Sequence, residues 1–316
     1  MAKFRDSTHD TSVFDASGPV GVPAASWKDP AASADMAQPE RSMGDILAEL
    51  RNLTAEQVEK VLQYQRTNGL RFGEAAVAMG LASKDDVLFA LSQQFHYPYA
   101  PEAERGASPE LVALNEPFSP RAEGFRALRS QLMMRILGDG EGQHRALALI
   151  SPGRGDGRTY CAANLAVALA QLGGKTLLVD ADMRNPRLHQ LFKLNNQSGL
   201  SGILSGRADK QVIQQAHGVS SLFVLPVGTT PPNPLELVER PAFGLLMREL
   251  ASKFDHVVVD TPAASHGADA SVITARCGAA VVIARKDATR VALLQDLVAS
   301  FEGSPVKLAG LVMNEV

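Results

Sequence analysis

The strongest constraint on the fold of this 316-residue chain is a series of short apolar segments, separated by helical patterns, that begins near residue 145. The segments read ALALIS, KTLLVD, SLFVLPV, DHVVVD, AAVVIAR and KLAGLVM. They are apolar almost throughout, as in parallel strands that are covered by helices on both faces. We expect the intervening helices near 159–172, 234–254 and 288–301. The pattern therefore predicts an α/β domain with a doubly wound, mostly parallel sheet.

Composition narrows the class of protein further. Apolar residues make up 45% and charged residues 21% of the chain, which is ordinary for a globular protein. No apolar run reaches the roughly 18 residues of a spanning helix, and the start MAKFRDSTHD is not a secretory signal, so we expect a cytoplasmic protein. A net charge of -3 does not favour nucleic acid as a partner. Cys161 and Cys277 are too few for a disulfide scaffold, and we expect both in the core.

The first third of the chain has a different organisation. Residues 1–40 are rich in Ala, Ser, Asp and Pro, which indicates a disordered leader. Residues 41–100 contain an internal repeat in which Thr54 corresponds to Ser83 when the chain is shifted by 29 residues. Each half reads as two helices, with Thr54 and Ser83 as N-caps. We predict a small all-α helical-repeat domain here, a linker over 101–116, a helix over 121–137, and the α/β domain over 117–316.

A glycine-rich loop follows the first apolar segment. Its sequence, SPGRGDGRT over 151–159, leads directly into a helix, so backbone N–H groups and the helix N-terminus can converge on phosphate oxygens. The residues expected at a nucleotide are Gly153, Arg154, Gly155, Asp156, Gly157, Arg158, Thr159 and Tyr160. The P-loop pattern G-x-x-x-x-G-K-[ST] is nearly met, with Arg158 at the lysine position and Pro152 at the first glycine. By itself the loop is equally well explained as a glycine-rich turn.

Carboxylates at two other strand ends favour the nucleotide site. Asp180 and Asp182 end KTLLVDAD, and Asp260 ends DHVVVD. Ligands of such sheets bind outside the carboxyl ends of the strands, where these groups converge with the loop. Thr159, Asp182 and Asp260 are oxygen donors of the kind that Mg²⁺ prefers. The loop and the carboxylates together predict a P-loop NTPase that binds ATP and Mg²⁺.

These motifs resemble those of the bacterial tyrosine kinases over residues 115–316. VDADMRNP resembles their additional Walker motif and HVVVDTP their Walker B strand. The set Glu123, Arg126 and Arg129 matches their E-x-x-R-x-x-R helix, and GTTPPNPLEL over 228–237 matches their proline-rich loop. The loop ending in Gly-Arg-Thr is similar to that of the EpsG-type chain-length determinant kinases. The repeat is similar to the N-terminal domain of type II secretion ATPases (GspE and MshE), some of which bind cyclic di-GMP.

The resemblance implies specific roles. Arg158 and the loop backbone would hold the β- and γ-phosphates, with Mg²⁺ on Thr159, Asp182 and Asp260. Asp180 would be the catalytic base, and Arg184 would either neutralise phosphate charge or form an ordinary ion pair. The Glu123, Arg126 and Arg129 helix implies a homo-oligomeric ring. A transmembrane chain-length determinant is implied as the adaptor, which would hold this cytoplasmic chain at the inner membrane and connect it to exopolysaccharide export.

Departures from the family pattern leave alternatives open. No tyrosine follows Tyr160, so autophosphorylation of the usual kind is not expected. An ATPase switch of the MinD and ParA type is a second interpretation, with Arg154 nearest to the additional lysine of those proteins. A non-catalytic nucleotide-binding scaffold is a third. In the repeat, Ser42 stands where the nucleotide-binding version has arginine and Arg51 where it has glycine, which favours protein docking over cyclic di-GMP.

Overall fold

A computed structural model describes residues 42–94, 108–137, 145–207 and 212–315. The expected leader, residues 1–40, lies outside these ranges. In the described part of the chain, every helix is too short or too polar to cross a membrane.

The repeat folds as the expected four helices. They are α1 (Met43–Arg51), α2 (Ala55–Asn68), α3 (Phe72–Ala78) and α4 (Lys84–Gln94). Both predicted N-caps are confirmed, because the hydroxyl of Thr54 accepts from the backbone N–H of Gln57 and that of Ser83 from the N–H of Asp86. The helices enclose their own apolar cluster, which includes Leu47, Val61, Ala75, Ala76 and Ala90.

The two positions that depart from the nucleotide-binding repeat have structural roles here. The hydroxyl of Ser42 caps α1 by accepting from the backbone N–H of Asp45. Arg51 donates from Nε to Asp86 at 2.7 Å and so ties the first half of the repeat to the second. Both side chains are therefore accounted for by the fold of the repeat itself.

The predicted doubly wound sheet is confirmed. Its strands are β1 (Ala146–Ile150), β2 (Thr176–Asp180), β3 (Gln214–Gln215), β4 (Leu222–Leu225), β5 (His256–Asp260), β6 (Gly278–Arg285) and β7 (Lys307–Asn314). The order across the sheet is β3-β4-β2-β5-β1-β6-β7. All neighbours are parallel except β3, which runs antiparallel to β4. The strands β2, β5 and β1, which end in the predicted site residues, are therefore adjacent.

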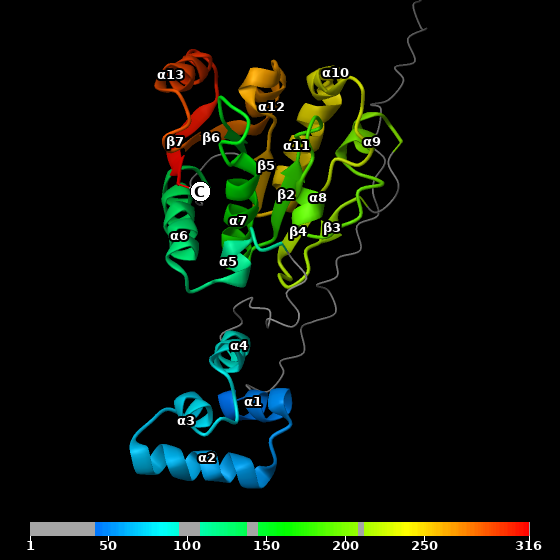
Figure 1. Cartoon of the computed structure of the whole chain (residues 1–316). Helices are drawn as coiled ribbons and strands as arrows, with labels where there is room; N and C mark the ends of the chain where they lie inside the picture. Colours follow the sequence, from blue (N-terminus) through cyan, green and yellow to red (C-terminus); the bar gives the residue numbers. More distant parts are fainter. Residues whose placement is uncertain (1–41, 95–107, 138–144, 208–211, 316) are drawn as a thin grey trace, which may run out of the picture.

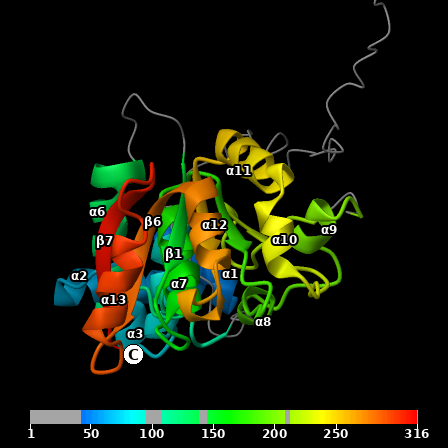
Figure 2. The same ribbon diagram turned by 90° about the horizontal axis from the view of Figure 1, so that it is seen from above.

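Helices cover both faces of the sheet (Figure 1). One face packs against α5 (Val112–Asn115), α6 (Pro120–Leu132), α7 (Arg158–Ala170) and α8 (Leu188–Leu191). The other packs against α9 (Leu200–Leu204), α10 (Pro234–Glu239), α11 (Pro241–Lys253), α12 (Asp269–Cys277) and α13 (Val291–Ala299). In Figure 2 the edge strand β7 lies beside β6 at one side of the domain and α9 lies at the other. Burial of each strand on both faces explains why the strand sequences are apolar almost throughout.

The element boundaries differ from the sequence-based expectation in several places. Helix 121–137 continues as a π-helical turn, Met133–Leu137, after α6 ends. The expected helices of the span 234–254 are α10 and α11, and the boundary between them falls at Pro241, which starts the second. The short strand β3, the helix α12 and the 3-10 turn Ala264–His266 were not predicted. The later part of the expected linker is packed structure, because α5 is buried against the sheet domain.

Both cysteines are buried and free, as expected.

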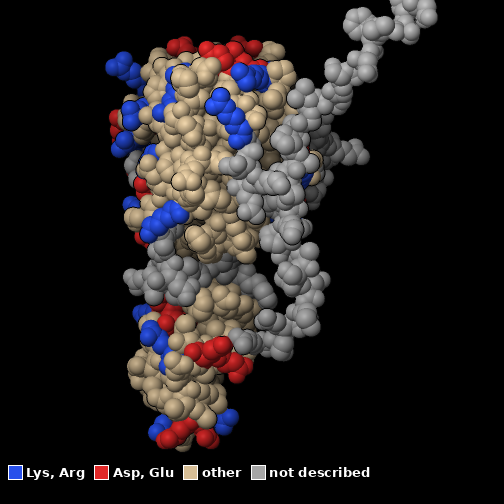
Figure 3. Space-filling model, turned by 90° about the vertical axis from the view of Figure 1, so that its right-hand side faces the viewer, with Lys and Arg blue, Asp and Glu red and all other residues tan. Residues whose placement is uncertain are grey.

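On the face seen in Figure 3, basic and acidic side chains are interspersed, in keeping with the small net charge. Anion binding by this chain must therefore depend on local arrangements of donors.

Candidate nucleotide and metal site

The glycine-rich loop forms a tight turn between β1 and α7. Gly155 and Gly157 adopt positive φ values of 83° and 98°, which side chains other than glycine rarely tolerate. A Cβ on Gly157 would fall on the side-chain amide of Asn314, whereas a Cβ on Gly155 would meet nothing within 4 Å. The loop is therefore closed on the side of β7 and open at Gly155, next to the N-terminus of α7.

Asp156 braces this loop from inside. Its Oδ2 accepts from the backbone N–H of Gly153 at 2.7 Å, and its Oδ1 accepts from the hydroxyl of Thr289 at 2.7 Å. Asn314 at the end of β7 donates from its side chain to the Asp156 carbonyl at 3.1 Å. The loop is thus held by residues that follow β6 and end β7, both distant in the sequence.

Arg158 lies beneath the loop and is 7% exposed. Its Nε donates to the carbonyl of Thr261 at 2.9 Å, and its Nη1 donates to the carbonyl of Gly153 at 2.7 Å and to the hydroxyl of Ser151. The guanidinium therefore organises the loop backbone and the end of β5. In this arrangement the positive charge of Arg158 lies directly under the glycine-rich loop, which is called the phosphate loop below.

Thr159 and Asp260 meet directly. The Thr159 hydroxyl donates to Asp260 Oδ2 at 2.6 Å. Asp260 Oδ1 is buried with no hydrogen-bond partner among the described residues. Burial raises the pKa of Asp260 to about 7, although the hydrogen bond from Thr159 acts in the opposite direction.

Asp180 stands beside Asp260, because the two are register partners on β2 and β5. Its Oδ2 accepts from the backbone N–H groups of Arg187 and Leu188, at 3.2 and 3.1 Å. Its Oδ1 is buried and has no hydrogen-bond partner in the described structure. Burial, and then the neighbouring Asp260 carboxylate, hold the pKa of Asp180 well above its ordinary value. The site therefore contains closely placed acids that favour holding a proton or a cation.

Asp182 completes the acidic group two residues past β2. Its Oδ1 accepts from the backbone N–H groups of Arg184 and Asn185, at 3.2 and 2.9 Å. Its charge acts on both Asp180 and Asp260. Asp182 thus belongs to the same group of carboxylates.

The donor set fits ATP with Mg²⁺. The unpaired oxygens of Asp180 and Asp260 are buried acceptors, and an unpartnered buried carboxylate oxygen is costly unless a cation or proton satisfies it. No cluster of three or more His, Cys, Asp or Glu suited to a metal occurs in the described ranges. The expected ligands, Thr159, Asp182 and Asp260, include only two carboxylates, as suits Mg²⁺ that keeps waters and phosphate oxygens.

Other predicted residues have contacts outside this group. Arg184 donates from Nη2 to both oxygens of Asp269 on α12, at 3.0 and 3.2 Å, so it forms an ion pair in this structure. Tyr160 packs edge-to-face on Phe125 of α6, with ring centroids 5.6 Å apart. Arg154 is exposed at the outer side of the loop.

The predicted oligomerisation residues lie on α6. Glu123 and Arg126 pair within the helix at 2.7 Å. Arg129 donates from Nη1 to the carbonyl of Ala168 at 2.7 Å and ties α6 to α7. At least part of this motif therefore serves the fold of the chain itself.

Some residues that contact the site were not predicted from the sequence. Ser151, Thr261, Asp269, Thr289 and Asn314 contact the loop or the predicted site residues. Ser151 and Thr261 lie inside the quoted motifs SPGRGDGRT and HVVVDTP, so the motifs pointed to their positions but not to their contacts. Thr289, Asn314 and Asp269 carried none, because their contacts depend on the order of strands in the sheet.

Several known proteins are similar to this chain in sequence. Residues 146–301 match the family model of the cellulose biosynthesis protein BcsQ. The putative tyrosine-protein kinase CapB of Staphylococcus aureus is 33% identical over 209 residues, which cover 65% of this chain and 89% of CapB. The tyrosine-protein kinase Wzc of Salmonella typhi is 28% identical over 66% of this chain. This chain spans only 28% of the length of Wzc.

Several solved structures are also similar to this chain. The chimerical protein CapA2B2 superimposes with a TM-score of 0.61 at 31% identity, covering 72% of this chain and 97% of that one. The kinase domain of the Escherichia coli tyrosine kinase ETK gives a TM-score of 0.61 at 30% identity, covering 65% of this chain and 80% of that one. The chain belongs to the family of bacterial tyrosine kinases, which are P-loop proteins.

Proposed function

We propose that this chain is an ATP- and Mg²⁺-dependent protein tyrosine kinase. One observation carries the proposal: the Thr159 hydroxyl bonds to Asp260 at 2.6 Å, and Asp260 is the register partner of Asp180 on the adjacent strand. Loop, metal ligands and candidate base thus converge at the carboxyl ends of β1, β5 and β2. Membership of the tyrosine-kinase family supports the same chemistry.

Each residue would contribute by position and charge. The loop N–H groups and Arg158 would bind the phosphates, and Thr159, Asp182 and Asp260 would hold the metal ion. Mg²⁺, when bound, supplies positive charge that neutralises the phosphate oxygens. Asp180 would orient the tyrosine hydroxyl and accept its proton.

We place this activity in exopolysaccharide export. The EpsG-type motifs support a role in setting polymer chain length, with a transmembrane chain-length determinant as adaptor and the chain at the cytoplasmic side of the inner membrane. Glu123 is exposed and Arg126 half-buried on α6, and their match to the E-x-x-R-x-x-R helix of the family supports assembly into a ring. The GspE- and MshE-like repeat would dock a protein partner or bind cyclic di-GMP, and the capping role of Ser42 favours docking.

The decisive experiment is incubation of the purified full chain with γ-labelled ATP and Mg²⁺, alone and with the cytoplasmic segment of the adaptor. Label on tyrosine is the result expected for a kinase. Release of labelled phosphate without labelled protein would instead identify an ATPase switch, and binding without either product a scaffold. Both of the latter outcomes overturn the kinase proposal.

Asp180→Asn tests the proposed base. We expect phosphoryl transfer to fall at least about 10²-fold, with ATP binding retained. Asp296→Asn, an exposed carboxylate on α13, is the matched control and should transfer normally. Full turnover in Asp180→Asn would exclude Asp180 as the base.

The ring is tested on the Glu123 and Arg126 pair of α6. Glu123→Ala with Arg126→Ala should convert an oligomer to a monomer on a sizing column. Arg129 is left in place, because it holds α6 to α7. An unchanged elution volume would exclude this helix as the ring contact.

A further inference from the structure

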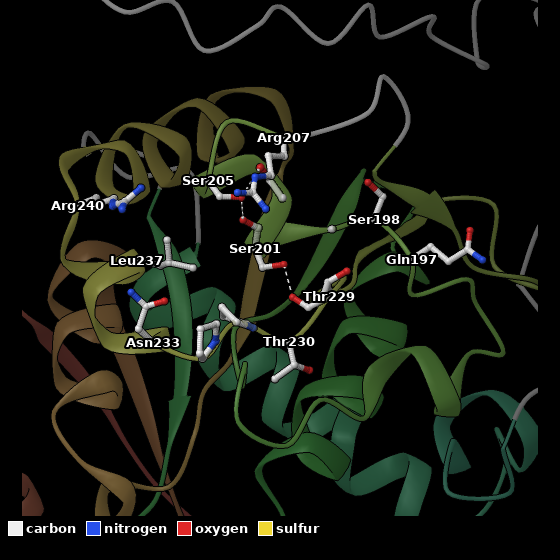
Figure 4. A pocket seen from close by; sticks show the side chains of 14 residues that line it. Gln197, Ser198, Ser201, Ser205, Arg207, Thr229, Thr230, Asn233, Leu237 and Arg240 are labelled. Atoms are coloured by element: carbon white, nitrogen blue, oxygen red, sulfur yellow. Dashed lines mark hydrogen bonds between the residues drawn. The ribbon is translucent and has the colours of Figure 1, made fainter.

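A second pocket lies away from the phosphate loop (Figure 4). It has a volume of about 530 Å³ and lies between residues 197–207, around α9, and the segment 229–240, which includes α10. The second segment overlaps the proline-rich motif GTTPPNPLEL over 228–237, which is not among the residues predicted for the nucleotide site. The pocket follows β4, whereas the phosphate loop follows β1, and the strands β2 and β5 separate the two.

The base of this pocket is built rigidly. Gly199 and Gly228 are in backbone contact, so a Cβ on either would collide with the other segment. The N–H groups of Leu200 and Ser201 donate to the carbonyls of Pro226 and Val227, both at 2.9 Å. The Ser201 hydroxyl adds a 2.6 Å bond to the carbonyl of Thr229. A pocket with this many fixed backbone contacts is formed before any ligand arrives.

Among the described residues, the pocket lining carries positive charge and no negative charge. Arg207 and Arg240 line it, and none of its lining residues is acidic. In the described structure the Arg207 side chain has no hydrogen-bond or ionic partner, and Arg240 has only a 3.4 Å bond to the carbonyl of Leu204. Figure 4 shows both arginines in the upper part of the view, with Ser205 near Arg207, and with Asn233 and Thr230 below them. Two guanidinium groups without carboxylate partners indicate a site for an anion.

The neutral residues of the lining narrow the class of anion. The hydroxyls of Ser198, Thr229 and Thr230 and the amides of Gln197 and Asn233 line the pocket together with the arginines, whereas Ser201 and Ser205 already donate to backbone carbonyls. Guanidinium forks and hydroxyl donors together match the oxygens of a phosphate group. The volume exceeds that of inorganic phosphate and leaves room for a polar substituent, while Pro231, Pro232 and Leu237 provide an apolar wall. We propose that this pocket binds a phosphate monoester.

Two sources supply this chemistry, a phosphorylated tyrosine side chain and a sugar phosphate. The test is isothermal titration of the full chain, without ATP, using O-phosphotyrosine, glucose 1-phosphate and inorganic phosphate as probes. Tyrosine, glucose and polyglutamate are the unphosphorylated controls. Because no nucleotide is present, the result is independent of kinase activity.

We expect saturable binding of at least one monoester, weakened roughly tenfold by Arg207→Gln and by Arg240→Gln. Arg248→Gln, an exposed arginine on α11 outside the pocket, should bind as the unaltered chain does. Arg158→Ala should also retain this binding, which separates the pocket from the phosphate loop. Melting curves verify that each variant folds, and Arg207→Lys, which keeps the charge but loses the fork, should give an intermediate affinity.

The relative affinities for O-phosphotyrosine and glucose 1-phosphate identify which kind of phosphate monoester the pocket binds. Tighter binding of O-phosphotyrosine assigns the pocket to a phosphorylated protein segment, and tighter binding of glucose 1-phosphate assigns it to a sugar phosphate. Three results would overturn the proposal: no saturable binding of any monoester, affinity unchanged in both arginine variants, or equal affinity for polyglutamate.

Discussion

Asp180 and Asp260 are register partners at the carboxyl ends of the adjacent parallel strands β2 and β5, and each has a buried oxygen without a hydrogen-bond partner in the described structure. Two carboxylates so placed resist ionising together. This relationship makes the site sensitive to pH and to cations.

The first prediction concerns pH and stability. The folded-state pKa of Asp260 is raised from 3.8 to about 7, so its contribution to stability is fully present below 3.8 and is lost as pH rises to about 7. Without metal, thermal denaturation should therefore show the unaltered chain losing stability relative to Asp260→Asn across this range. Mg²⁺ with ATP should restore more stability near neutral pH than near pH 4, because metal ligands must be deprotonated. A difference between the two proteins that is constant with pH would contradict the assignment.

The second prediction concerns Arg184 and Asp269. Asp269 is 2% exposed and accepts from Arg184 with both oxygens. Arg184→Ala and Asp269→Asn should each lower the free energy of unfolding by about 1–3 kcal/mol, and the double variant by less than their combined effect. Urea denaturation of the four proteins measures this coupling. If the effects are additive while only Arg184→Ala abolishes phosphoryl transfer, Arg184 acts on the phosphates and not through the ion pair.

The third prediction concerns the brace on the phosphate loop. Thr289→Val removes the hydroxyl that donates a hydrogen bond to Asp156. We expect the loop to be held less firmly as a result. We expect a stability loss of about 1 kcal/mol and several-fold weaker ATP binding, measured by titration of the apo protein. Thr67→Val, which removes a hydroxyl bonded within α2, is the matched control. Unaltered ATP affinity in Thr289→Val would show that the brace does not order the loop.

The fourth prediction compares two glycines in the same loop. Both Gly155 and Gly157 have positive φ, but only Gly157 faces an obstacle, the Asn314 side chain. Gly155→Ala should cost about 1–2 kcal/mol of stability from backbone strain. Gly157→Ala should cost clearly more and should abolish ATP binding, because Asn314 must move as well. Equal losses in the two variants would place Asn314 elsewhere.

Much of the fold could be predicted from local patterns. The six parallel strands, the four helices of the repeat and the caps Thr54 and Ser83 follow from apolar runs and capping chemistry. The helices over 234–254 were expected, with their boundary at Pro241 left open, and α12 was missed in the chain between β5 and β6. Boundaries depend on packing that a local pattern does not contain.

The sequence by itself determined which residues are candidates for the chemistry, because a glycine-rich loop after one strand and aspartates at the ends of others together favour a nucleotide and metal site at that edge of a parallel sheet. Only the tertiary structure decided their partners. Strand order places β5 between β1 and β2, and so brings Thr159 to Asp260 and Asp180 beside it. It also brings Asn314 and Thr289 to the loop and Asp269 to Arg184. These contacts join residues far apart along the chain, and their geometry exists only once the sheet has assembled.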